Sequence, residues 1–266
     1  MMTTHIIKAP DGTPLHVTTE GSEFLPALML SNSLGTDLNL WALQAPEFAK
    51  SFRVVRYDRR GHGQSSLGSA PHTIDTLGED ALTIMNALGL DKVHWCGLSM
   101  GGMVGQWLAA NAPGRIDRLV LSNTSAYFAD KQRWNDRIKA IRDKGLPPLA
   151  ESVMSLWFTQ GFRQNAPGTI AAMTKMFNAT PVDGYIAACE AIRDMDHRNL
   201  LAKITAPTLV IAGKYDQSTP VEMAEFMATG IEDASLAVMD TAHIANVEDP
   251  AIYTDIVEKF LTQPAR

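Results

Sequence analysis

The sequence has few cysteines, no long apolar run and no basic stretch, and each absence excludes a class of protein. Its only cysteines, Cys96 and Cys189, do not make a disulfide framework. Apolar runs such as 209–212 are far too short to span a membrane. The net charge of −6 comes without a basic stripe, which argues against nucleic acid as a partner.

Signals for targeting, metals and cofactors are also missing. The N-terminus, MMTTHIIKAPDG, leads directly into a strand pattern and lacks the basic and apolar regions of a secretory signal. No cluster of His, Asp and Glu has the spacing of metal ligands. We therefore expect a cytoplasmic protein that binds a small molecule and uses neither metal nor cofactor. The oligomeric state cannot be read from the sequence.

Strands and helices alternate along most of the chain. With 266 residues, of which 45% are hydrophobic, the chain is long enough for one large core. We expect strands at 6–8, 15–19, 27–30, 53–57, 93–96, 116–121, 208–212 and 235–239. The helices expected between and after them are 40–49, 74–88, 102–112, 221–227 and 250–261. This alternation predicts an α/β fold whose mostly parallel, eight-stranded sheet is covered by helices.

The middle of the chain has a different pattern. Four helical stretches, 130–142, 149–158, 169–177 and 182–194, follow one another without a strand and are separated by proline and glycine. We therefore predict a core formed by residues 1–125 and 202–266. Residues 126–201 are predicted to form a helical cap inserted after the sixth strand.

The stretch from Val93 to Trp107, VHWCGLSMGGMVGQW, contains a strand, a G-x-S-x-G turn and the start of a helix. A serine at the apex of so sharp a turn needs small neighbours, and Gly97 and Gly101 provide the room. The helix directs its N-terminal amides toward the serine, where negative charge would develop. We predict Ser99 as a nucleophile; the alternative is an ordinary tight turn.

A serine nucleophile needs a base, and only two histidines follow Ser99. His197 lies in a charged stretch of the cap and is expected to be solvated. His243 follows the last strand and so lies at the carboxyl edge of the sheet, where the turn at Ser99 also opens. We predict His243 as the base, the alternative being a histidine that caps a helix.

The base in turn needs an acid that orients it. Asp216 lies in the loop after the strand at 208–212 and would accept the Nδ1 proton of His243. Its alternative role is to cap a turn before Pro220, and Asp240 is the next candidate for the acid. An oxyanion hole would use the backbone amides of Met100 and of Leu34, which follows the third strand.

These segments together resemble the α/β-hydrolase family over nearly the whole chain, and among its members the 3-oxoadipate enol-lactonases. The resemblance rests on SNSLGT at 31–36, YDRRGHG at 57–63, CGLSMGG at 96–102, WNDRI at 134–138 and WF at 157–158. It implies hydrolysis of 3-oxoadipate enol-lactone in the β-ketoadipate pathway of aromatic catabolism, with no cofactor. The glycine-rich loop at 60–63 lacks the spacing of a nucleotide-binding motif and is expected to be a structural turn.

Such a substrate carries a free carboxylate, so an arginine in the cap is expected to bind it. Arg133 and Arg137 lie four residues apart on one predicted helix, and Trp134 shares a face with Arg137. The alternative is that both arginines are solvated and the tryptophan belongs to the core.

Two other functions remain open. One is a general carboxylesterase, lactonase or cofactor-free perhydrolase that uses the same three residues on another acyl group. The other is a catalytically silent, receptor-like binding protein on the same scaffold. Dehalogenase and epoxide hydrolase chemistry are disfavoured because position 99 would then carry a carboxylate.

Overall fold

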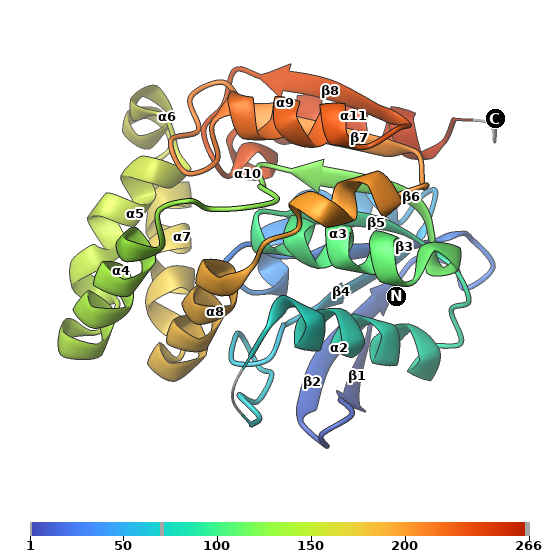
Figure 1. Ribbon diagram of the computed structural model, residues 1–266, viewed down its shortest axis with the longest axis horizontal. Coiled ribbons are helices and arrows are strands. Elements are labelled where there is room, and N and C mark those ends of the chain that lie inside the picture. The colour runs from blue at the N-terminus through green and yellow to red at the C-terminus, as the bar shows by residue number, and fades with distance from the viewer. Residues whose placement is uncertain (1, 70–71, 264–266) are drawn as a thin grey trace.

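The computed structural model describes residues 2–69 and 72–263 (Figure 1). Within them, one sheet of eight strands has the order β1-β2-β4-β3-β5-β6-β7-β8. The strands are β1 (Thr3–Lys8), β2 (Pro14–Glu20), β3 (Ala27–Ser31), β4 (Arg53–Tyr57), β5 (Val93–Leu98), β6 (Ile116–Ser122), β7 (Thr208–Gly213) and β8 (Ala234–Met239). β2 runs antiparallel to β1 and β4, whereas the other neighbours are parallel, which confirms the predicted sheet.

Burial explains why the central strands carry no polar alternation. Every residue of β3, β5 and β7 is buried, as expected for parallel strands that helices cover on both faces. The two antiparallel strands at the edge are joined by a tight turn in which Gly12 adopts a φ of +85°, a conformation that favours glycine. The strands expected at 6–8 and 15–19 therefore form an antiparallel hairpin.

Helices cover both faces of the sheet, and two neighbouring residues of β5 show this. Trp95 and Cys96 point to opposite faces because side chains alternate along a strand. The Nε1 of Trp95 donates to the Gly101 carbonyl of α3 (Met100–Asn111) over 3.0 Å. The Sγ of Cys96 lies 3.5 Å from the Tyr253 hydroxyl of α11 (Pro250–Leu261), so α3 and α11 lie on opposite faces.

The other elements outside the middle segment lie between the strands or after the last one. They are the 3₁₀ helix η1 (Leu38–Trp41), α1 (Ala45–Phe48), α2 (Ile74–Ala87), the 3₁₀ helix η2 (Pro113–Arg115), α9 (Val221–Gly230) and α10 (Ala245–Glu248). Of these, α2 and α9 are at positions that the alternation predicts. The single helix expected over 40–49 is wrong, because the segment forms η1 and α1 instead. Pro46 lies in the first turn of α1 and has no N–H with which to continue a helix from η1.

Helices alone fill the chain between β6 and β7. They are α4 (Lys131–Lys144), η3 (Pro147–Leu149), α5 (Ala150–Trp157), α6 (Gln160–Asn165), α7 (Pro167–Ala179), α8 (Val182–Asp194) and η4 (Arg198–Lys203). The sequence did not predict α6, a short helix whose N-terminus is capped by the Thr159 side chain. Figure 1 shows α4 to α7 together beyond one end of the strands. Within the described ranges, every helix is too short or too polar to cross a lipid bilayer.

Candidate active site

The turn at Ser99 has the strained geometry that the glycine spacing predicts. Ser99 adopts φ +56° and ψ −116°, a conformation that a non-glycine residue rarely adopts. A Cβ on Gly97 would lie 2.1 Å from the Gly101 carbonyl oxygen, and one on Gly101 would lie 2.2 Å from the Ser31 carbonyl oxygen. Both glycines are therefore required by close approach. The helix begins at Met100, two residues earlier than expected, so Ser99 sits directly at its N-terminus.

Asp216 and His243 form a buried hydrogen-bonded pair. The Nδ1 of His243 lies 2.7 Å from Oδ2 of Asp216, and both residues are at least 95% buried. Asp216 follows β7 and His243 follows β8, so neighbouring parallel strands bring the two loops together. Because Asp216 engages Nδ1, Nε2 is the ring nitrogen of His243 that stays free for another partner.

The Asp216 carboxylate is held by further donors. Oδ1 accepts from the amides of Ser218 (2.7 Å) and Thr219 (3.0 Å), and Oδ2 accepts from the Thr219 hydroxyl (2.6 Å) and Nδ2 of Asn123 (3.1 Å). Burial would raise the pKa of Asp216, but the neighbouring His243 and these hydrogen bonds outweigh it and hold the pKa below its usual value. The carboxylate therefore stays ionised beside the imidazole.

Sequence reasoning did not find two residues that support this pair. Asn123 adopts φ +46° directly after β6, and no sequence signal except its place at a strand end indicated it. Glu248 accepts the Ala242 amide on Oε2 (2.8 Å), next to His243, and the Thr159 amide on Oε1 (3.1 Å). Glu248 thus ties the loop of His243 to the start of α6.

The histidine that was set aside and the second candidate for the acid lie elsewhere. His197 was expected to be solvated, but it is 6% exposed, and burial lowers its pKa to about 4. The expectation is wrong because its amide donates to the Ala126 carbonyl (2.8 Å), which draws the residue inward where the helical segment joins the sheet. Asp240 is 80% exposed and pairs with Lys214 over 3.1 Å. The described residues contain no group of three or more His, Cys, Asp or Glu that could hold a metal ion.

Two buried amides near Ser99 have no acceptor among the described residues. They belong to Leu34 and Met100, the pair expected to form an oxyanion hole. The Gly101 amide donates instead to the Asn32 carbonyl (3.0 Å), which fixes the loop of Leu34 against the start of α3. Both amides are therefore available to a developing negative charge.

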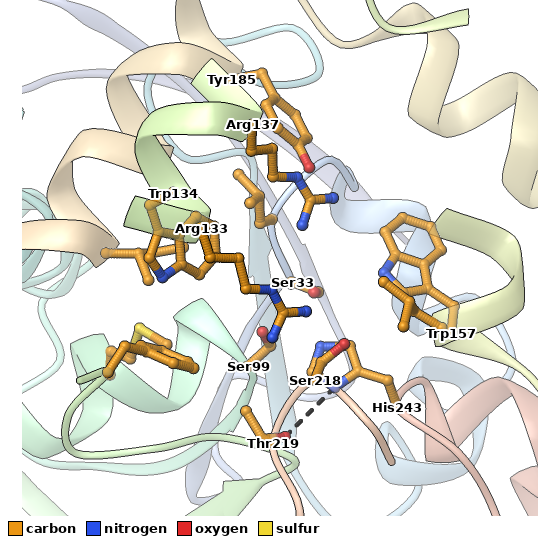
Figure 2. Close-up of a pocket in the computed structure, with 15 residues that line it drawn as sticks. Ser33, Ser99, Arg133, Trp134, Arg137, Trp157, Tyr185, Ser218, Thr219 and His243 are labelled. Carbon is orange, nitrogen blue, oxygen red and sulfur yellow. Dashed lines mark hydrogen bonds between the residues drawn. The ribbon is translucent and has the colours of Figure 1, made fainter. Parts of the chain in front are cut away.

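A pocket of about 510 Å³, including its open mouth, lies over Ser99 and His243. Figure 2 shows Arg133 and Arg137 extending their guanidinium groups into the space that Ser99 and His243 also line. The carbon Cζ of Arg137 lies 5.8 Å from the centre of the Trp134 ring and 5.5 Å from that of Tyr185. Among the described residues, neither arginine forms an ion pair with a carboxylate.

The pocket has further walls that sequence reasoning did not assign. Trp157 of α5 and Tyr185 of α8 line it, together with Ser33, Met103, Phe128, Leu156, Ile192, Ser218 and Thr219. The pair Trp157-Phe158 belongs to the resemblance noted above, but Tyr185 had no sequence signal. Outside the pocket, Arg60 is buried and pairs with Asp80 (2.6 Å) and Asp11 (2.9 Å), as expected of a structural turn.

Comparison with known proteins places the chain among hydrolases. The model of the α/β-hydrolase fold matches residues 26–250. The 3-oxoadipate enol-lactonase 2 of Acinetobacter baylyi is 38% identical over 92% of this chain and 91% of that protein. A protein of Agrobacterium fabrum with the name "Putative carbamate hydrolase RutD" is 30% identical over 89% of this chain and 93% of that protein. The crystal structure of the enol-lactonase from Burkholderia xenovorans LB400 has a TM-score of 0.94 at 37% identity, covering 98% of this chain and all of that one.

Proposed function

The chain belongs to the α/β-hydrolase family, and we propose that it opens a small carboxylated lactone, 3-oxoadipate enol-lactone, to 3-oxoadipate. In this proposal Ser99, His243 and Asp216 form a catalytic triad. Residues 1–125 and 202–266 form the core, and residues 126–201 form a cap that covers the triad. The identity to proteins named 3-oxoadipate enol-lactonases, 37–38% over more than nine-tenths of the chain, supports this substrate class.

The mechanism uses groups whose geometry is described above. The Ser99 oxygen attacks the lactone carbonyl carbon while Nε2 of His243 takes the hydroxyl proton, and Asp216 stabilises the resulting imidazolium. The amides of Leu34 and Met100 hold the oxyanion. Collapse breaks the ring C–O bond and expels an enolate, which is protonated and becomes a ketone. Water, activated by His243, then hydrolyses the acyl-enzyme.

The observation that carries the proposal is the charge of the pocket. Arg133 and Arg137 line the same cavity as Ser99 and His243, and neither has a carboxylate partner among the described residues. A guanidinium group binds a carboxylate through charge-assisted, often bidentate hydrogen bonds. Because the lactone leaves one carboxylate free, a cation on the wall opposite Ser99 would orient the ring with its carbonyl at the serine. An uncharged ester would not use these arginines.

The experiment that tests the proposal is a substrate panel. Purified wild-type enzyme is given 3-oxoadipate enol-lactone, a neutral lactone of similar size, p-nitrophenyl acetate and a small carbamate, and kcat/KM is measured for each. We expect the carboxylated lactone to exceed the neutral one by at least about 30-fold, the lower end of the value of one charged contact. Preference for the simple ester would identify a general carboxylesterase, and preference for the carbamate would identify a carbamate hydrolase. The absence of any turnover would favour a binding protein.

A further inference from the structure

Arg59 is a buried arginine beside the proposed oxyanion hole. It follows β4 and is 4% exposed. Its Nη2 donates to the Asn32 carbonyl, and its Nη1 lies 2.9 Å from the sulfur of Met100. A carbonyl and a thioether are neutral, and the thioether is a weak acceptor. Arg59 forms no ion pair within the described ranges, and the Asp58 carboxylate acts on its charge only through space.

The neighbouring carboxylate is occupied by other donors. Asp58 accepts the amides of Leu38 (2.8 Å) and Gln64 (2.9 Å), and one of its oxygens lies 2.9 Å from Nδ1 of His16. Burial lowers the pKa of Arg59 to about 10, which still leaves the group protonated at neutral pH. The site therefore contains a lasting positive charge that the mechanism above does not use.

The next residue, Arg60, has the environment of a structural arginine, and it differs from that of Arg59. Arg60 is equally buried, but both Asp80 and Asp11 neutralise it. Arg59 has no such partners and instead contacts the two segments that carry the free amides. One is the loop of Asn32, two residues before Leu34, and the other is Met100 itself.

We propose that Arg59 is a positioning residue for the oxyanion hole and that its buried charge favours the tetrahedral intermediate over the bound substrate. The proposal rests on the function proposed above. By holding the Asn32 carbonyl and the Met100 side chain, Arg59 sets the spacing between the Leu34 and Met100 amides. Its positive charge, added to that of the α3 N-terminus, gains a further nearby negative charge when the oxyanion forms. An interaction that strengthens in this way accelerates the reaction without tightening ground-state binding.

The test compares Arg59→Met and Arg59→Lys with the matched control Arg56→Met. Arg56 is also buried, also belongs to the β4 region and pairs with Glu20 over 2.6 Å, away from the pocket residues. The substrate is p-nitrophenyl acetate, so the result does not depend on which lactone the enzyme prefers. The inhibition constant of phenylboronic acid, which forms a tetrahedral adduct with an active serine, is measured beside kcat, KM and Tm.

For Arg59→Met we expect kcat to fall by about 100-fold with KM changed less than about threefold, the pattern of a lost oxyanion contact. The boronic acid should bind more weakly by a similar factor. Arg59→Lys keeps the charge and should recover at least about tenfold of the loss. Arg56→Met should lower Tm but keep kcat.

Three results would contradict the positioning role of Arg59 or limit its test. If Arg59→Met lowers Tm as Arg56→Met does but keeps kcat and boronate affinity, Arg59 is only structural and the inference is wrong. If Arg59→Met does not fold, Arg59→Lys decides alone, because a positioning role requires kcat to fall at unchanged KM. A wild-type enzyme that turns over no ester or lactone would overturn the proposed function, and this inference with it.

Discussion

The two sides of the pocket are built in different ways. On the side of the sheet, Asp216 accepts hydrogen bonds from a histidine, an asparagine, a hydroxyl and two amides. On the side of the helices that follow β6, Arg133 and Arg137 point into the cavity without a carboxylate partner among the described residues (Figure 2). The Asp216 carboxylate is therefore satisfied before any ligand binds, whereas the guanidinium groups on the other side have charges that a ligand would satisfy.

From this difference we infer that the sheet side carries out the reaction and that the helical side selects the substrate. Catalysis by an ionised acid and an oriented base requires groups that are already in place before substrate binds. Recognition of an anion requires donors that remain free until it arrives. We therefore expect substitutions on the sheet side to reduce the rate on every substrate, and substitutions on the helical side to reduce it mainly on carboxylated ones.

The largest effect is expected on the sheet side, from Ser99→Ala. Loss of the proposed nucleophile should reduce kcat by at least ~10⁴-fold on charged and neutral substrates alike. Steady-state kinetics on both substrates measures this, with circular dichroism as the control for folding. Activity near that of the wild type would place the nucleophile elsewhere.

Asp216→Asn should come next. The amide cannot stabilise the imidazolium and favours the wrong tautomer of His243, so kcat should fall by on the order of 10⁴-fold at nearly constant KM. The comparison variant is Asp240→Asn, which alters an exposed carboxylate near the same strand edge and should leave kcat unchanged. Equal effects of the two substitutions would mean that Asp216 is not the orienting acid.

The helical side is tested by Arg133→Ala and Arg137→Ala, made separately. Loss of the arginine that holds the substrate carboxylate should cost roughly 2–5 kcal/mol in kcat/KM on the carboxylated lactone and spare a neutral ester. Arg142→Ala, on the exposed surface of the same helix, is the matched control. Equal losses of kcat/KM on both substrates would contradict the distinction between the two sides. If kcat/KM does not fall on either substrate, neither arginine binds the substrate carboxylate.

A smaller effect is expected from Thr219→Val. The Thr219 hydroxyl donates to Oδ2 of Asp216 over 2.6 Å, and a hydrogen bond to a charged group contributes about 1.5–3 kcal/mol. We expect kcat to fall by about tenfold or somewhat more on all substrates. Thr219→Ser keeps the hydroxyl and should retain most of the activity. If valine and serine behave alike, the hydroxyl does not support the acid.

The last prediction concerns stability, not rate, where the helical segment joins the sheet. The pKa of His197 is about 4 in the folded protein, because burial disfavours its charged form, and 6.5 is its ordinary value. Below pH 6.5 the unfolded chain binds a proton that the folded chain does not. The contribution of His197 is thus complete above pH 6.5 and is lost as the pH falls to 4, by up to about 3 kcal/mol.

Urea unfolding at pH 7.5 and pH 5 measures this loss in the wild type and in His197→Gln. The pKa values of His62, His72 and His94 are also lowered, so the wild type and the variant share a background loss from these residues. The variant should lose less stability than the wild type over this interval. An identical loss would show that His197 is protonated while folded.

The fold could be predicted because its signals are local. Apolar strands such as 93–96, the glycines around Ser99 and the strand ends before Asp216 and His243 each follow from a few neighbouring residues. The environment of His197, the partners of Asp216 and the place of Tyr185 in the pocket depend on contacts between segments far apart in the chain. The spacing of apolar residues along the chain does not indicate such contacts. The charged residues around His197 predicted a solvent-exposed side chain, but the backbone hydrogen bond from His197 to Ala126 holds the residue in a buried position.

The most direct measurement is to trap the intermediate at Ser99. Wild-type enzyme is mixed with 3-oxoadipate enol-lactone, quenched with acid within milliseconds, digested and examined by mass spectrometry, with Ser99→Ala treated in parallel. If the reaction passes through a covalent intermediate at Ser99 and the arginines of the cavity orient the substrate, the wild type should yield an acylated peptide that contains Ser99. The variant that lacks the carboxylate-binding arginine should yield less of this peptide, and Ser99→Ala should yield none. Steady turnover of the lactone with acylation of another residue, or with the same turnover in Ser99→Ala, would contradict this mechanism.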